Sequence, residues 1–277
     1  MKVLIILLLL LCLTPGKAFS RQESGKRPTT TNYVKGVEAL NAGDAETAYK
    51  YLNAEIHQSP GNGYAHCYMA LVCNYFGNPS LALQAADTSL RLLPASDTEY
   101  VAFAHYVKGM LCFGGNAPAK ALADLNEAVR LAPADSEYRK LRAQVLLAQG
   151  EGEAAFADLS AVLQKGEDPE ADELVDQLAE IVPTEQMLQR IASCYAQAGQ
   201  PSSALKYVEM ALLLAPSNAR LYALRADAEY ECGLYGKALA SYRKACRMDA
   251  DAAAQCRMLI HLQKLDKEKE AMPLAHR

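Results

Sequence analysis

The sequence predicts an all-α fold in which six helical hairpins follow one another along the chain. The first observation is a recurring spacing, in which an Ala follows a Gly by five residues and a Pro follows that Ala by twelve. The second is a pair of segments, GNPSLALQAADTSLRLLP at 77–94 and GQPSSALKYVEMALLLAP at 199–216, that are identical at eight of 18 positions. The third is the step of 34 residues between adjacent copies, as from Gly43 to Gly77. Helix-breaking residues at this fixed period predict a repeated helix-turn-helix unit.

Residues 1–20 precede the repeats and predict a cleavable signal peptide. An apolar run follows Lys2, and the small residues Ala18 and Ser20 stand at the −3 and −1 places of a signal-peptidase site. The run covers only residues 3–13, whereas a membrane-spanning helix needs roughly 20 apolar residues. A lipoprotein anchored through Cys12 is disfavoured, because two bulky leucines precede that cysteine.

The mature chain is therefore expected to be exported, periplasmic or secreted, and to begin at Arg21. Loss of Lys2 and Lys17 changes the formal net charge from −4 to −6. An acidic surface offers no electrostatic footprint for nucleic acid, and no transmembrane segment is predicted in the mature chain. Residues 21–31 are polar and contain Pro and Gly, which predicts a flexible leader.

Each predicted hairpin places small residues where its two helices would cross. Small side chains allow antiparallel helices to approach closely, the Gly permits a left-handed turn, and the Pro ends the second helix. In the third copy Asn116 replaces the Gly. The second helices contribute Ala48, Ala82, Ala121, Ala155, Ala204 and Ala238. The first helices contribute Gly36, Ala70, Gly109, Ala143, Ala192 and Ala226.

These positions together resemble the tetratricopeptide repeat (TPR), a 34-residue helix-turn-helix unit, over nearly all of the mature chain. The resemblance implies a right-handed α-solenoid of six repeats, with repeats 1–4 at 29–166 and repeats 5–6 at 185–252. It also implies a binding scaffold, because the first helices of this family line a concave groove that receives a peptide or helix of another protein.

Residues 167–184 interrupt the repeat and predict an inserted helix from Pro169 to Val182. Asp168 and Pro169 are a typical cap and first helical residue. Leu174, Val175, Leu178, Ile181 and Val182 form one apolar stripe. Seven acidic residues and no basic residue lie between Glu167 and Glu180. This acidic run indicates either a solvated face or a site for a basic partner.

Two smaller departures predict further features. Ser96 and Glu99 have capping-box spacing within a five-residue insertion, so the first helix of repeat three is expected to begin over a turn early. Residues 253–277 predict a capping helix and tail, which a stacked array needs to cover the apolar face of its last repeat. The apolar positions of this helix are Met258, Leu259, Leu262 and Leu265.

The sequence contains no pattern that predicts catalysis. The five histidines lack metal-ligand spacing, and His66 and His105 occupy equivalent places where packing is the expected role. Gly114-Gly115 lies between two predicted helices and therefore indicates a turn, not a phosphate-binding loop. No catalytic residue, metal site or cofactor is expected.

The resemblance assigns the groove to fixed places of each first helix. Those places are apolar and aromatic in the first three repeats and polar later, as at Gln189. We expect the apolar half to bind an amphipathic or extended segment. The alternative is that the protein covers it, through the leader, tight curvature or a homodimer. The predicted groove residues are Tyr33, Val37, Tyr64, Leu71, Asn74, Phe103, Tyr106, Met110 and Phe113.

The expected partner is another protein of the cell envelope. A carbohydrate-binding protein and a purely structural spacer remain the alternatives. Seven cysteines follow residue 20, an odd number that cannot all pair within the chain, and buried thiols are the default expectation. Cys246 and Cys256 are the best-placed pair for a disulfide, because they lie symmetrically about the turn near Asp251.

Overall fold

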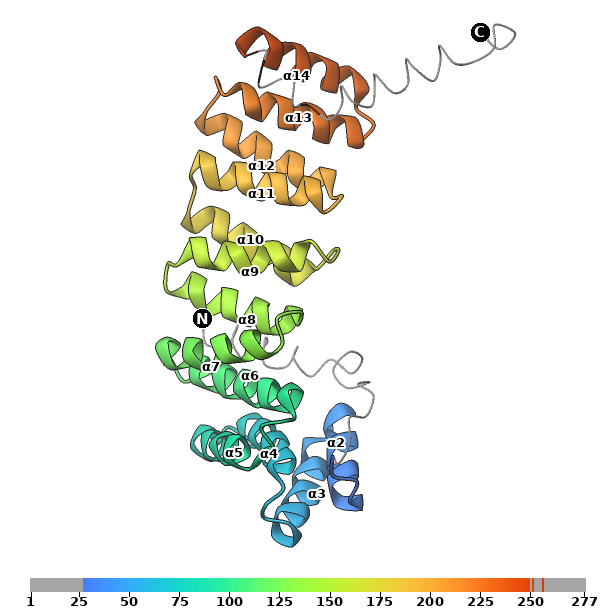
Figure 1. The fold of residues 1–277 in the computed structure, drawn as a ribbon, viewed down its shortest axis with the longest axis vertical. Coiled ribbons are helices and arrows are strands. Elements are labelled where there is room, and N and C mark those ends of the chain that lie inside the picture. The colour runs from blue at the N-terminus through green and yellow to red at the C-terminus, as the bar shows by residue number, and fades with distance from the viewer. Residues whose placement is uncertain (1–26, 250, 252–255, 257–277) are drawn as a thin grey trace, which may run out of the picture. The chain divides into compact units, whose positions relative to one another are not determined.

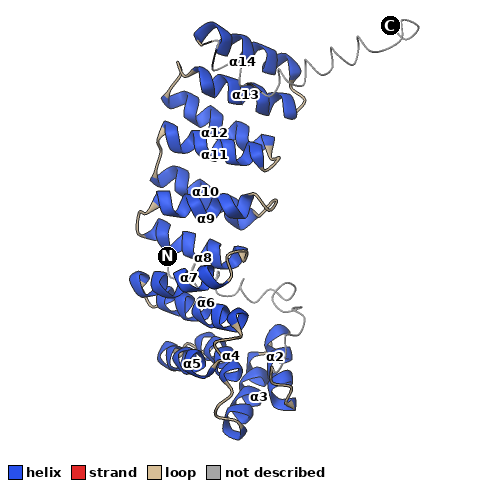
Figure 2. Cartoon of the chain, in the orientation of Figure 1, coloured by secondary structure: helices blue, strands red, loops and turns tan. Residues whose placement is uncertain are grey.

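The computed structural model describes residues 27–249, 251 and 256, and every regular element among them is a helix (Figure 2). The chain divides into two compact units, and the boundary lies between Val145 and Leu146. The predicted signal peptide, most of the leader and the predicted capping helix lie outside the described residues.

The first unit contains three helical hairpins and most of a further helix, α8 (Figure 1). The hairpins pair α2 with α3, α4 with α5, and α6 with α7. The helix bounds are α2 (Thr31–Asn41), α3 (Ala45–Gln58), α4 (Gly63–Tyr75), α5 (Pro79–Leu92), α6 (Thr98–Gly114), α7 (Pro118–Leu131) and α8 (Ser136–Ala148).

The second unit pairs α11 with α12 and α13 with α14, and its α9 contacts both α10 and α11. Its helices are α9 (Gly152–Leu163), α10 (Pro169–Ile181), α11 (Glu185–Gln197), α12 (Pro201–Leu214), α13 (Ala219–Glu231) and α14 (Tyr235–Met248). The described part of the chain thus holds thirteen helices packed in consecutive pairs, which confirms the predicted all-α repeat fold.

The turns inside the hairpins adopt the left-handed conformation that the sequence predicts. Their φ angles lie between 73° and 78° at the glycines and at 57° at Asn116. Because only Gly, and less readily Asn, tolerates this region, the repeated residue is set by the backbone and not by packing. The glycines are Gly43, Gly77, Gly150, Gly199 and Gly233.

The small residues at the helix crossings are as closely packed as the pattern requires. All six repeated alanines of the second helices are fully buried. A Cβ atom added at Gly36 would lie 2.7 Å from Cγ of Leu52, and one added at Gly109 would lie 2.7 Å from Cγ of Leu125. Glycine at these two places therefore leaves room for a leucine of the paired helix.

Helix α6 begins early, as predicted, but with a different cap. It has 17 residues, against 11 to 13 for α2, α4, α8, α11 and α13. The capping side chain is Asp97 and not Ser96, and it accepts a hydrogen bond from the backbone N–H of Tyr100 at 3.4 Å. The carboxylate of Glu99 pairs with Arg27 at 2.6 Å.

Helix α10 is the predicted inserted helix, and part of its acidic run has partners in the protein. Asp168 caps its first turn. Asp172 accepts a hydrogen bond from the hydroxyl of Tyr195 at 2.7 Å, and Asp176 accepts one from that of Tyr207 at 2.6 Å. The two tyrosine rings stack with centroids 5.4 Å apart. These acidic residues thus fasten α10 to α11 and α12, so the run is more than a solvated face.

Candidate partner-binding site

The predicted groove residues lie on α2, α4 and α6, the first helices of three consecutive hairpins. Helix α2 contacts α4, and α4 contacts α6, so these helices are neighbours in the first unit. Tyr33, Tyr64 and Met110 are buried. The remaining residues are half-buried, and they are Val37, Leu71, Asn74, Phe103, Tyr106 and Phe113.

Four buried tyrosines, which we call the tyrosine cluster, join the three helices: Tyr33, Tyr64, Tyr68 and Tyr100. The hydroxyl of Tyr100 is 3.4 Å from that of Tyr33 and 3.1 Å from that of Tyr68. The ring centroids of Tyr64 and Tyr100 are 4.8 Å apart in an edge-to-face arrangement. Burial raises the pKa of Tyr33 and Tyr68 well above the ordinary value. These hydroxyls therefore remain neutral hydrogen-bonding groups.

Tyr68 and Tyr100 were not among the predicted site residues. A signal for Tyr68 was present, because it follows Tyr64 by four residues and so lies on the same helix face. Tyr100 lies in the five-residue insertion, outside the repeating pattern. Its place in the cluster depends on the early start of α6, which makes the insertion part of the site.

Beside the tyrosine cluster, half-buried apolar side chains from all three helices pack on one core. Val37, Leu71, Phe103 and Tyr106 contact the same group of buried residues. The ring of Phe103 lies 6.5 Å from that of Tyr106, which in turn stacks on Tyr138 at 4.8 Å. Because Tyr106 also touches two further core groups, it contributes to the fold as well as to this surface.

Residues 27–30 lie against one end of the tyrosine cluster. Arg27 pairs with Asp97 at 3.1 Å, and its guanidinium lies 4.5 Å from the centroid of the Tyr100 ring. Asp97 also accepts a hydrogen bond from the hydroxyl of Tyr64 at 3.0 Å. Arg27, part of the predicted leader, thus contacts Tyr100 of the tyrosine cluster and the carboxylate that binds Tyr64.

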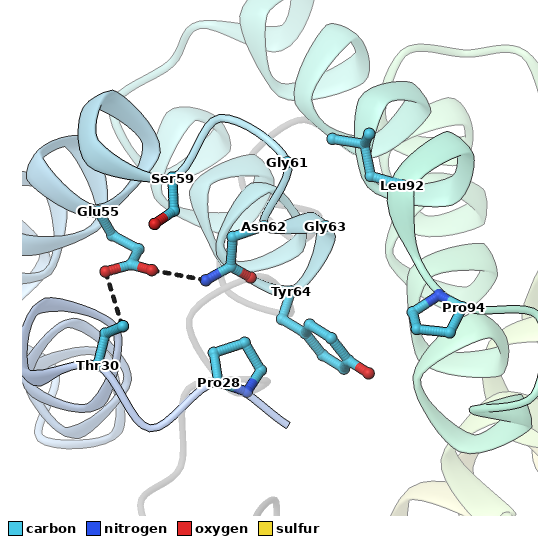
Figure 3. A pocket seen from close by; sticks show the side chains of 10 residues that line it. All are labelled: Pro28, Thr30, Glu55, Ser59, Gly61, Asn62, Gly63, Tyr64, Leu92 and Pro94. Atoms are coloured by element: carbon cyan, nitrogen blue, oxygen red, sulfur yellow. Dashed lines mark hydrogen bonds between the residues drawn. The ribbon is translucent and has the colours of Figure 1, made fainter. Parts of the chain in front are cut away.

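The same segment borders a cavity of about 340 Å³ at the ends of α3, α4 and α5 (Figure 3). Figure 3 shows Pro28 beside the ring of Tyr64, with Leu92 and Pro94 across the cavity. The buried carboxylate of Glu55 accepts hydrogen bonds from the hydroxyl of Thr30 at 2.7 Å and the amide of Asn62 at 2.8 Å. The polar contacts of Glu55 hold residues 27–30 at the edge of this cavity.

The second unit presents a polar surface at the corresponding places. Gln189 and Ser193 of α11 line an open cavity of about 320 Å³ together with residues of α9. The aromatic ring in its lining is Phe156, and the guanidinium of Arg190 lies 4.4 Å from that ring. This composition agrees with the polar character that the sequence indicates for the later repeats.

The structure does not bond Cys246 to Cys256, and the disulfide between them stays a prediction. Sγ of Cys256 lies 3.0 Å from Oδ1 of Asp227. A hydrogen bond with Cys246, together with partial burial, raises the pKa of Tyr242 to about 12. Five of the seven cysteines that follow residue 20 are buried, as expected for packing residues.

The two histidines at equivalent repeat positions are half-buried and do not belong to the core. Nδ1 of His105 lies 2.9 Å from Oδ1 of Asp124, and Nε2 of His66 lies 3.1 Å from the carbonyl oxygen of Pro60. Among the described residues, His, Cys, Asp and Glu side chains do not gather in groups of three that could hold a metal ion. In the same part of the chain, each helix is too short or too polar to cross a membrane.

The family model of the tetratricopeptide repeat matches residues 106–172 and 190–253. Among solved structures, a tetratricopeptide repeat protein from Parabacteroides merdae is 18% identical, with 79% of this chain and 94% of that chain covered and a TM-score of 0.42. YrrB, described as a TPR protein with an unusual peptide-binding site, is 16% identical, with 75% and 97% covered and a TM-score of 0.37. PilW, described as a type IV pilus biogenesis factor, is 16% identical, with 79% and 94% covered and a TM-score of 0.43. No curated protein matches the chain.

Paired helices, left-handed turns and close small-residue crossings define a helical-repeat protein. The matching model makes the class more specific for residues 106–172 and 190–253, which match the tetratricopeptide repeat. Proteins of this class act as protein–protein interaction scaffolds and are typically non-catalytic. The similar structures, at these identities and scores, carry no information about the partner of this chain.

Proposed function

We propose that this protein is an extracytoplasmic scaffold that binds a segment of another envelope protein across α2, α4 and α6. The observation that carries the proposal is the half-buried apolar surface formed by Val37, Leu71 and Phe103 on one shared core. Asn74, also half-buried, adds a polar group on α4. An apolar surface rimmed by polar groups is typical of sites that receive an amphipathic or extended segment.

The binding energy should concentrate on the central aromatic residue of this surface. Truncation of such an anchor typically costs about 2 kcal/mol or more, so Phe103→Ala should weaken partner binding at least ~10-fold. Tyr106→Ala is a less specific probe, because loss of the stacking on Tyr138 would also destabilise the fold. Gln189→Ala, in the polar second unit, is the control and should leave binding unchanged.

The test is photocrosslinking in cells from a reactive residue placed at Leu71, compared with one at Leu213. Leu213 is 84% exposed and lies on α12, which belongs to the second unit. A protein captured from position 71, absent from position 213 and lost with Phe103→Ala would support the proposal. Equal capture from both positions, or oligosaccharide binding in place of protein binding, would contradict it.

The proposed location rests on the signal-peptide pattern of residues 1–20. Cleavage after Ser20 would leave a chain that begins at Arg21 with a free amino group. N-terminal sequencing of protein purified from the periplasmic fraction tests this expectation. Full-length protein in the cytoplasm, or lipid attached to Cys12, would show that the chain is not exported in this way.

A further inference from the structure

Arg27 occupies a site that has the chemistry of an arginine receptor. Its Nε and Nη2 atoms donate to the two carboxylate oxygens of Asp97 at 3.1 and 3.2 Å, and Nη2 also donates to Glu99 at 2.6 Å. The guanidinium lies 4.5 Å from the centroid of the Tyr100 ring. A planar fork held by two carboxylates against an aromatic face is a mode of recognition that suits arginine better than lysine.

The receptor side of this contact is held in place by the fold itself. Asp97 caps α6 and accepts a hydrogen bond from the hydroxyl of Tyr64. Tyr100 is 7% exposed, and its hydroxyl lies within hydrogen-bonding distance of Tyr33 and Tyr68. The carboxylate and the ring therefore keep their geometry through contacts that do not involve Arg27.

The occupant, in contrast, is a short non-helical segment that leads into α2. Residues 27–30 are joined to the receptor side by the side chain of Arg27, and to α3 by the hydrogen bond from Thr30 to Glu55. Thr30 has an extended backbone conformation, with φ −61° and ψ 144°. Residues 27–30 thus resemble a bound peptide that belongs to the same chain.

The arginine site is continuous with the apolar surface of the proposed function. The ring of Tyr100 lies 6.3 Å from that of Phe103, so a segment bound over Phe103 reaches the carboxylates of Asp97 and Glu99 within a few residues. A basic side chain would also suit the chain as a whole, which has a formal net charge of −4.

We propose that Asp97, Glu99 and Tyr100 form a receptor for an arginine side chain of an extended partner segment, and that Arg27 is its built-in competitor. The proposal rests on the proposed function, because it specifies the chemistry of the same partner. An intramolecular occupant lowers the apparent affinity for the partner by the fraction of molecules in which the site is filled. Release of Arg27 would therefore increase binding without any change in the receptor residues.

A labelled peptide with the sequence of residues 25–31, GKRPTTT, is the probe, titrated by fluorescence anisotropy against the full chain. Arg27→Ala removes the competing guanidinium, so the peptide should bind this variant at least ~10-fold more tightly than the unsubstituted protein. Arg91→Ala, which removes an exposed arginine of the same unit, is the matched control and should not change the affinity.

Two further variants test the chemistry of the site. A peptide with glutamine in place of its arginine, and the protein variant Glu99→Gln combined with Arg27→Ala, should each lose at least ~10-fold in affinity. Glu99 does not cap α6, so its substitution leaves the helix start intact. Absence of binding to Arg27→Ala, or equal binding of the glutamine peptide, would overturn the proposal. Because this titration uses no envelope protein, it can fail or succeed independently of the capture from position 71.

Discussion

The substitution Gly109→Ala tests the close helix crossing of the third hairpin. The new Cβ atom would lie 2.7 Å from Cγ and 2.9 Å from Cδ2 of Leu125, which is fully buried, and 3.3 Å from the carbonyl oxygen of Ala121. Overpacking of this kind costs about 1–3 kcal/mol, whereas alanine in place of glycine within a helix gains about 0.5–1 kcal/mol. We expect a net loss of about 1–2 kcal/mol in the free energy of unfolding.

Urea unfolding followed by circular dichroism measures this loss, and Gly114→Ala is the matched control. Gly114 lies on the same helix, and a Cβ atom added there would meet nothing within 4 Å. A double-mutant cycle identifies the cause. Leu125→Ala alone should lower the free energy of unfolding by about 2–5 kcal/mol. In the Gly109→Ala background the same substitution should lower it by at least about 1 kcal/mol less. Equal stability of the two glycine variants, or strict additivity in the cycle, would refute the crossing as the reason for Gly109.

Three further predictions follow from single contacts. Tyr207→Phe removes the hydroxyl that donates to Asp176, and should lower the free energy of unfolding in urea by about 1.5–3 kcal/mol; no change would mean that this bond does not hold α10. Partial burial alone would raise the pKa of Asp97, but hydrogen bonds such as that from Arg27 lower it overall. The stabilising contribution of the Asp97 carboxylate is therefore present above the unfolded pKa near 3.8 and is lost as pH falls through the lower folded pKa. The difference in the free energy of unfolding between the unsubstituted protein and Asp97→Asn should therefore shrink only in acid. A difference that persists through acid titration would contradict this. Asn116→Ala should lower thermal stability by about 1–2 kcal/mol because φ is +57°, while Asn116→Gly should not; equal melting of the two variants would argue against backbone strain.

The hairpins, their turns and the inserted helix could be predicted from the sequence because each depends on local constraints. A left-handed turn requires Gly or Asn, and a close crossing requires a small residue, so both restrict the residue type at the same position of every repeat. Helix α10 could be predicted for the same reason, since Asp168 and Pro169 mark its start and an apolar stripe marks its buried face.

The details of the site could not be predicted, because they join residues that are distant in sequence. Arg27 and Asp97 are 70 residues apart, and Tyr33 and Tyr100 are 67 apart. No spacing rule connects such pairs, since their contact depends on how successive hairpins are rotated against one another. The cap of α6 shows a related limit, because Ser96 and Asp97 are both good caps and only the packing selects between them.

The tyrosine cluster has a consequence for the way in which the first unit opens. In most helical-repeat arrays each repeat contacts only its neighbours, so the ends can unfold while the middle stays folded. Here Tyr33 and Arg27 reach the residues that begin α6, and so connect the first hairpin directly to the third. Amide hydrogen exchange in α2, α4 and α6 should therefore report one shared opening free energy in place of a gradient from the end of the chain inward.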